Sequence, residues 1–301
     1  MTAHVLTIVN ARQVLAQCDP VALREAVGAF SAVDVRLRGF SGAGGYTNCD
    51  RLDDKLWKRW KGHLDGVWEG DDGERPTAAR VIYGLARLAG AEAWGHGWLE
   101  AANDAQAYQE AGFVLPVVDE YGLARWGVNA EIGTFGRGKP LTSVPRQRIR
   151  AGQDASRAFR YAMRAAHSVA LDWMGFADLT WMYGAGPEHD AEFVALWDEC
   201  AQMAYQTAWE GRAGAKATCE RGRALWTGPW SPLVGVGRWH DDNRNGRVDP
   251  GEVVGSVSTL RNIIAEFAPE RVRHYVGNDA ATQITVGRPD YPALGSLVRG
   301  L

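Results

Sequence analysis

The sequence predicts a mainly α-helical protein with a small β component, in one compact domain that is compatible with a lysozyme-like layout. Segments within 50–68, 150–173 and 193–208 repeat apolar residues every three or four positions, as one buried helix face requires. Only residues 33–40 alternate apolar and polar side chains like a strand. The 301 residues are 46% hydrophobic and 23% charged, which is typical of a globular chain and excludes a disordered or fibrous one.

The N-terminal segment, residues 1–48, is expected to mix both kinds of element. Residues 4–10 fit either a strand or the start of a helix that Asp19-Pro20 interrupts, because proline has no backbone N–H to donate. Apolar spacing from Pro20 to Phe30 predicts a helix before the strand at 33–40. The sequence does not decide between a strand and a helix for residues 4–10.

Residues 49–215 are expected to form a helical body. Helix 50–68 is followed by a helix that Pro76-Thr77 opens, with further helical turns through Trp94 and Trp98. Residues 111–142 are rich in glycine and broken by two prolines, so we expect short strands and loops there. Because functional groups concentrate on loops held by a scaffold, this stretch is the candidate cleft lining.

The segment 226–270 contains a calcium-loop pattern followed by a predicted helix. The pattern D-x-[DN]-x-[DN]-G-x5-E is complete, and the residues expected to bind the ion are Asp241, Asn243, Asn245, Arg247 through its backbone carbonyl, Asp249 and Glu252. Calcium prefers six to eight oxygen ligands, which alternating short Asp and Asn side chains supply. An Asp/Asn/Gly turn without metal is the alternative, because turns favour the same residues.

Residues 239–252, WHDDNRNGRVDPGE, resemble an EF-hand loop of the bacterial type, as found in surface-protein B repeats and dockerin modules. The resemblance covers only these residues of the chain and implies a Ca²⁺ ligand set there. The incoming segment GPWSPLVGVG cannot be a long helix, whereas Val254 to Phe267 supports one on the outgoing side. Since regulatory EF-hands work through helix pairs, we expect a structural calcium ion.

The candidate chemistry is glycan hydrolysis. Such enzymes need two carboxylates across a cleft, one protonated and one ionised. Within 111–142 the candidates are Glu120 as acid and Glu131 as base, with Asp119 third; ordinary surface carboxylates are the alternative.

The 13 tryptophans exceed ordinary usage, and flat aromatic faces suit sugar rings. The predicted substrate contacts are Trp126, Tyr121 and Trp230, whereas tryptophans on the apolar helical stripes are assigned to the core. The cysteines and histidines show no spacing typical of a zinc site.

Charge and hydropathy restrict the partners. The 33 basic and 36 acidic residues give a net charge of −3, which does not favour nucleic acid. No apolar run approaches the roughly 18 residues of a membrane helix, and no signal peptide is recognised. We expect the calcium site to have only moderate affinity, and cytosolic free calcium is too scarce to fill such a site. The protein is therefore expected to act outside the cell after lysis, or in a virion.

Two hypotheses follow. The first is a calcium-stabilised, muramidase-like cell-wall hydrolase such as a phage lysin, and the second is a non-enzymatic calcium-binding virion or surface protein that holds glycan. The sequence gives neither the substrate nor the oligomeric state.

Overall fold

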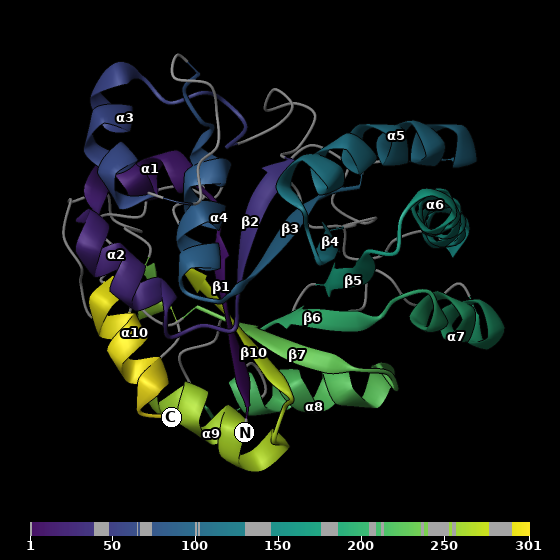
Figure 1. The fold of residues 1–301 in the computed structure, drawn as a ribbon. Helices are drawn as coiled ribbons and strands as arrows, with labels where there is room; N and C mark the ends of the chain where they lie inside the picture. The colour runs from purple at the N-terminus through teal and green to yellow at the C-terminus, as the bar shows by residue number, and fades with distance from the viewer. Residues whose placement is uncertain are drawn as a thin grey trace.

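The protein is a closed barrel of parallel strands surrounded by helices (Figure 1). The computed structural model describes residues 2–38, 48–64, 66, 74–99, 101, 103–129, 146–175, 186–204, 209–211, 214–235, 238–239, 253–254, 257–276 and 291–301. The barrel strands are β1 (Ala3–Ile8), β2 (Ala32–Arg38), β3 (Glu92–Trp98), β4 (Arg125–Asn129), β5 (Ala170–Gly175), β6 (Glu199–Met203), β7 (Trp230–Val234) and β10 (Arg271–Val276). A separate antiparallel pair consists of β8 (Arg238–Trp239) and β9 (Val253–Val254).

The strands follow one another around the barrel in the order β1-β10-β7-β6-β5-β4-β3-β2. Every neighbouring pair is parallel, and the first strand closes on the last with Ala3 opposite Arg271 and Ile8 opposite Val276. This closure leaves no strand edge in the barrel unpaired.

Helices alternate with the strands along the chain. They are α1 (Ala11–Gln17), α2 (Pro20–Val27), α3 (Asp54–Trp60), α4 (Ala78–Leu88), α5 (Asp104–Tyr121), α6 (Arg146–Ala166), α7 (Pro187–Ala195), α8 (Ala215–Leu225), α9 (Val257–Phe267) and α10 (Tyr291–Arg299), with a 3₁₀ turn at Lys61–His63 after α3. Several begin at polar caps: Asp19, Asp53, Thr77 and Asn103 accept hydrogen bonds from first-turn backbone N–H groups. None of the described helices has the length and apolar character needed to cross a membrane.

The prediction of a mainly helical protein is wrong, and the reason is physical. Strands of a parallel barrel are short and buried on both faces, so they do not alternate apolar and polar residues. Trp94 and Trp98, assigned to helical turns, belong to β3. The predicted helices 150–173 and 193–208 each run past a real helix into a strand, β5 and β6.

Other elements were predicted correctly. The strand expected at 33–40 is β2. The helix expected to begin at Pro20 is α2, and the helix expected to end at Phe267 is α9. The segment left open at 4–10 contains β1. Residues 111–121, expected to be irregular, are the second half of α5, which accommodates Pro116.

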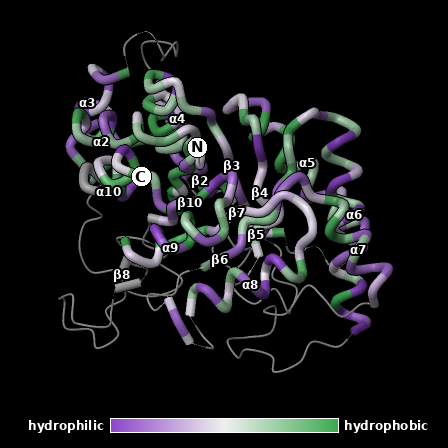
Figure 2. The backbone as a smooth tube through the Cα atoms, turned by 90° about the horizontal axis from the view of Figure 1, so that it is seen from below, coloured by the Kyte–Doolittle hydropathy of each residue, from purple (hydrophilic) through white to green (hydrophobic). Residues whose placement is uncertain are grey.

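The main hydrophobic core lies between the strands and the helices, where outward-facing strand residues such as Trp126 and Trp173 pack. Figure 2 shows hydrophobic residues recurring among hydrophilic ones along the surrounding helices. A smaller apolar cluster, defined by Val9, Met174, Ala201, Leu233 and Tyr275, fills part of the barrel interior. Val5, Ala32 and Trp94 form a further small apolar cluster. The polar residues between these clusters form the site described next.

The two ends of the barrel are built differently. Helices return to the next strand through short segments such as 122–124, 167–169 and 196–198. Strands lead to the following helix through longer segments, including 39–53, 130–145 and 277–290. The carboxyl-terminal ends of the strands therefore carry most of the connecting chain, and this is the end at which such barrels bind substrates.

Candidate functional site

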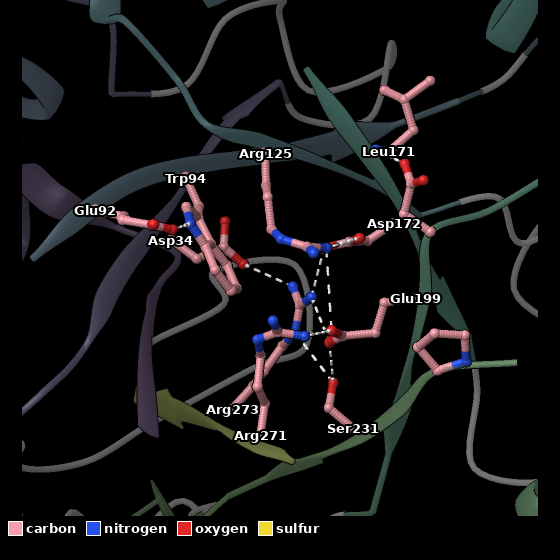
Figure 3. Close-up of polar contacts among 12 residues, drawn as sticks. Asp34, Glu92, Trp94, Arg125, Leu171, Asp172, Glu199, Ser231, Arg271 and Arg273 are labelled. Carbon is pink, nitrogen blue, oxygen red and sulfur yellow. Dashed lines mark hydrogen bonds and ion pairs between the residues drawn. The ribbon is translucent and has the colours of Figure 1, made fainter. Parts of the chain in front are cut away.

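An ionic cluster occupies the interior of the barrel near the amino-terminal ends of the strands (Figure 3). Its members are Asp34, Arg125, Asp172, Glu199, Arg271 and Arg273. Inward-facing positions of five strands supply them, and three carboxylates meet three guanidinium groups. The formal charges therefore balance inside a space that is closed to most solvent.

Arg273 is the centre of this ionic cluster. It is 1% exposed, and its Nη2 lies 2.6 Å from Asp172 Oδ2 and 2.9 Å from Glu199 Oε1. Its Nη1 lies 3.7 Å from Asp34 Oδ2, and its Nε donates to Ser231 Oγ over 3.3 Å. The guanidinium fork thus holds carboxylates from three strands at once.

The other two arginines complete the neutralisation. Arg125 binds Asp172 and Arg271 binds Glu199. The indole of Trp94 lies against all three guanidinium groups, at 5.1 Å from Arg125, 6.0 Å from Arg271 and 5.1 Å from Arg273. Cation–π attraction of this kind is strongest for tryptophan and away from water.

The two deepest carboxyl groups differ in pKa. Burial raises the pKa of Asp172 to about 6, against the opposing attraction of Arg273 and Arg125. Burial also acts to raise the pKa of Glu199, but Arg273 and the hydrogen bond that Ser231 donates outweigh it and lower that pKa to about 2. The cluster thus favours an ionised Glu199 under ordinary conditions.

The burial and pairing of this cluster make it a poor candidate for acid–base catalysis. Asp172 and Glu199 are 0% and 1% exposed; Asp172 forms ion pairs with two arginines and Glu199 with three. They come from the third residue of β5 and the first residue of β6, whereas substrates of such barrels bind at the opposite ends of the strands.

Closer to the carboxyl-terminal ends, the interior has an apolar and a polar side. The apolar side is the cluster around Met174 and Tyr275 on β5, β6, β7, β10 and the residue after β1. On the polar side, Asp34 Oδ1 lies 2.8 Å from His96 Nδ1, and Trp98 is in register with Asn129. Strands β2, β3 and β4 supply this polar side. We define the candidate site as the polar side together with the carboxyl-terminal ends of the strands.

Three residues predicted from the sequence lie away from this site. Glu120, near the end of α5, is half exposed, and its Oε1 lies 3.2 Å from the guanidinium of Arg80. Tyr121 is 2% exposed and shares a 2.9 Å hydrogen bond with Thr77. Trp126 is 1% exposed and packs in the outer core. All three lie near the amino-terminal end of β4, and none lines the carboxyl-terminal mouth.

Trp230, the fourth such residue, is 6% exposed at the start of β7. Its indole N–H donates to Gln202 Oε1 over 2.9 Å, and its ring packs against Phe267. Glu131 lies outside the described residues, although it follows the last residue of β4 by two positions in the sequence. The calcium-loop residues 241–252 also lie outside the described part of the chain.

Neither the ionic cluster nor the Asp34–His96 pair was predicted from the sequence. Asp34 stands in the strand expected at 33–40, but its partners His96 and Arg273 come from β3 and β10. The other members of the cluster come from β4, β5, β6 and β10. Only strand alternation within a closed barrel would have placed them together, and the helical interpretation of β3, β5 and β6 removed that signal.

No protein-family model and no curated protein matches the chain. Among solved structures it is similar to a chitinase from Rhizomucor miehei, with 9% identity, a TM-score of 0.61 and coverage of 99% of both chains. It is also similar to catalytic domain 2 of the Group II chitinase of Ostrinia furnacalis, with 8% identity, a TM-score of 0.59 and coverage of 100% and 97%. The spore cortex-lytic enzyme SleL of Bacillus megaterium matches with 6% identity and a TM-score of 0.55, over 98% of this chain and 74% of that one. At these identities the likeness establishes the barrel fold, which hosts many activities.

Proposed function

We propose that the protein is a glycan hydrolase that acts on a β-1,4-linked cell-wall or chitin-type polymer. The observation that carries this proposal is the closed parallel barrel, whose long connections follow the strands' carboxyl-terminal ends and which shares its fold with the chitinases and the cortex-lytic enzyme. Fold likeness alone does not assign an activity, so the proposal depends on the residues at this end.

We propose Glu131, expected from the sequence to be the base, as the catalytic acid in place of Glu120. Residues that directly follow barrel strands belong to the loops around the mouth, which supply catalytic groups in barrels of this type. Glu131 holds such a position after β4 in the sequence. We leave Glu120 out of the site, since it pairs with Arg80 near the other end of the barrel.

The test is release of reducing ends from purified peptidoglycan and from chitin by the wild type and by Glu131→Gln. We expect release from at least one polymer by the wild type and a loss of at least 100-fold in Glu131→Gln, because general acid catalysis contributes about 10²–10⁴. Glu192→Gln, which alters an exposed carboxylate on α7, is the matched control and retains activity. Loss of release in Glu120→Gln with full retention in Glu131→Gln would contradict the assignment.

The alternative is a non-enzymatic glycan-binding protein of a virion or surface. It predicts that the wild type sediments with one of these polymers without releasing reducing ends from it. Sedimentation without release, with calcium and with EDTA, would replace the hydrolase proposal by this one.

We also propose that a structural calcium ion is bound by residues 241–252. The donor set of short carboxylates and amides suits this hard cation. In the described part, β8 and β9 pair with Trp239 opposite Val253, so the ends of the segment between them lie together. A loop that encloses an ion needs this closure, because its first and last ligands bind the same ion. When bound, the ion would fix the connection that leads into α9.

A further inference from the structure

The Asp34–His96 pair has no role in the function proposed so far. The two side chains are 1% and 5% exposed, and Oδ1 of Asp34 lies 2.8 Å from Nδ1 of His96. With the carboxylate as acceptor, Nδ1 carries the proton and Nε2 keeps its lone pair as an acceptor. None of the described residues forms a hydrogen bond with Nε2.

The surroundings of the pair are short of hydrogen-bond partners. Thr7 is in register with Asp34 on the neighbouring strand, and its Oγ1 is buried with no partner among the described residues. Oδ2 of Asp34 is also buried without a hydrogen bond there, and its nearest cation is Nη1 of Arg273 at 3.7 Å. Buried polar atoms are normally paired with protein, water or ligand, so this part of the interior is suited to receive a polar group.

The groups around His96 come from β2, β4, β5 and β10. β2 presents Asp34 below it and Arg36 in register with it. β10 contributes Arg273, which reaches Asp34, while β4 and β5 present the uncharged Gly127 and Met174. A Cβ built on Gly127 would lie 3.0 Å from Cβ of His96, so the backbone of β4 passes directly beside the ring.

We propose that His96, oriented by Asp34, is a ligand-positioning residue whose Nε2 accepts a hydrogen bond from a hydroxyl or amide group of the glycan. This inference rests on the proposed function, because it takes the glycan as the ligand at the mouth. It assigns His96 a part in binding, with the bond-breaking step left to Glu131. A purely structural pair would instead stabilise the barrel without affecting the ligand.

Kinetics of three variants separate these roles. His96→Leu removes the acceptor, and we expect KM to rise at least tenfold with kcat within threefold of the wild type. His96→Gln restores a hydrogen-bond acceptor, so we expect KM to recover to within threefold of the wild-type value. The control His167→Gln alters a His–Asp pair on the outside, with His167 Nε2 3.1 Å from Asp119, and leaves KM unchanged.

A second measurement does not depend on turnover or on the folding of variants. The ring ¹⁵N resonances of the wild type are followed while a tetramer of β-1,4-linked N-acetylglucosamine is added. We expect Nε2 of His96 to shift and the ring of His167 to stay unchanged. Equal behaviour of the two rings, or an unaltered KM in His96→Leu, overturns the inference. If the wild type releases no reducing ends but the His96 ring still shifts, the hydrolase proposal fails and the binding role stands.

Discussion

Arg273 and Asp172 lie 101 positions apart in the chain, yet their side chains meet at 2.6 Å in the centre of the barrel. One residue stands on the last strand and the other on the fifth. Their contact therefore joins two strands that are not neighbours in the barrel, and the same guanidinium also holds Glu199. The ionic cluster couples the stability of the whole barrel to one buried arginine.

Replacing this arginine should destabilise the fold strongly. Arg273→Met leaves Asp172 with only Arg125, and Glu199 with Arg271 and the more distant Arg125, in a space closed to most water. Breaking a buried ion pair in this way costs about 3–5 kcal/mol. We expect the free energy of unfolding, measured by urea denaturation at neutral pH, to fall by that amount. Arg157→Met is the control, since its partners Asp154 and Glu192 are exposed, and it should cost at most about 1 kcal/mol. Equal losses in the two variants would show that the cluster contributes little.

The first and last strands also meet through two histidines. His4 Nδ1 lies 2.9 Å from His274 Nε2, and burial, with a smaller contribution from His4, lowers the pKa of His274 to about 3. Between pH 6.5 and about 3 the unfolded state therefore binds more protons at this site than the folded state. The stability that the neutral ring contributes is complete above pH 6.5 and is lost as the pH falls through this window.

Urea denaturation at pH 7 and pH 4.5 tests this pair. The wild type should lose about 2–3 kcal/mol more than His274→Gln between the two pH values, because each pH unit below the unfolded pKa contributes about 1.4 kcal/mol. His189→Gln, an exposed substitution on α7, should follow the wild type. A parallel decline of wild type and His274→Gln would contradict a buried neutral ring.

Gly127 stands at a position of β4 where a larger residue does not fit. A Cβ on Gly127 would lie 2.8 Å from Met174 Sδ and 3.0 Å from His96 Cβ, so Gly127→Ala forces both neighbours to move. Overpacking of this kind costs about 1–3 kcal/mol, which thermal or urea unfolding would measure. Gly112→Ala in α5 is the matched control: nothing lies within 4 Å of its added Cβ, and alanine favours a helix by about 0.5–1 kcal/mol. A stabilising Gly127→Ala would mean that Met174 and His96 can move aside without loss of packing.

The sequence predicted best those elements that have one solvent-exposed side, and worst those that are buried on both sides. Helices with one solvent-facing side, such as α2 and α9, show a clear 3.6-residue period. The segment of β5 is six residues long with five of them buried, and its apolar residues simply extend the period of α6. No local pattern separates such a strand from a helix end, so the alternation of strand and helix that marks a parallel barrel was lost.

The same cause limited the site. Trp126 and Trp230 were expected at a ligand because neither stands on a predicted apolar helical stripe, but both stand on strands and are buried. Glu131 was singled out by its loop position; it lies outside the described residues, two positions after the end of β4 in the sequence. His96 was not singled out among the histidines of the sequence, because its partner Asp34 is 62 positions away in the chain.

The calcium proposal makes a prediction about stability that is independent of catalysis. If the ion binds only the folded chain, raising free calcium to 100 times its Kd should stabilise the wild type by about 2.7 kcal/mol. The double variant Asp241→Ala and Glu252→Ala removes the first and last ligands of the motif, so its melting temperature should be the same with calcium and with EDTA. Asp242→Ala is the matched control, because that carboxylate lies between two ligand positions of the motif and should leave the calcium response intact. Identical melting of the wild type in EDTA and in excess calcium would refute the site, whereas loss of the response in Asp242→Ala alone would mean that the ligand register is shifted.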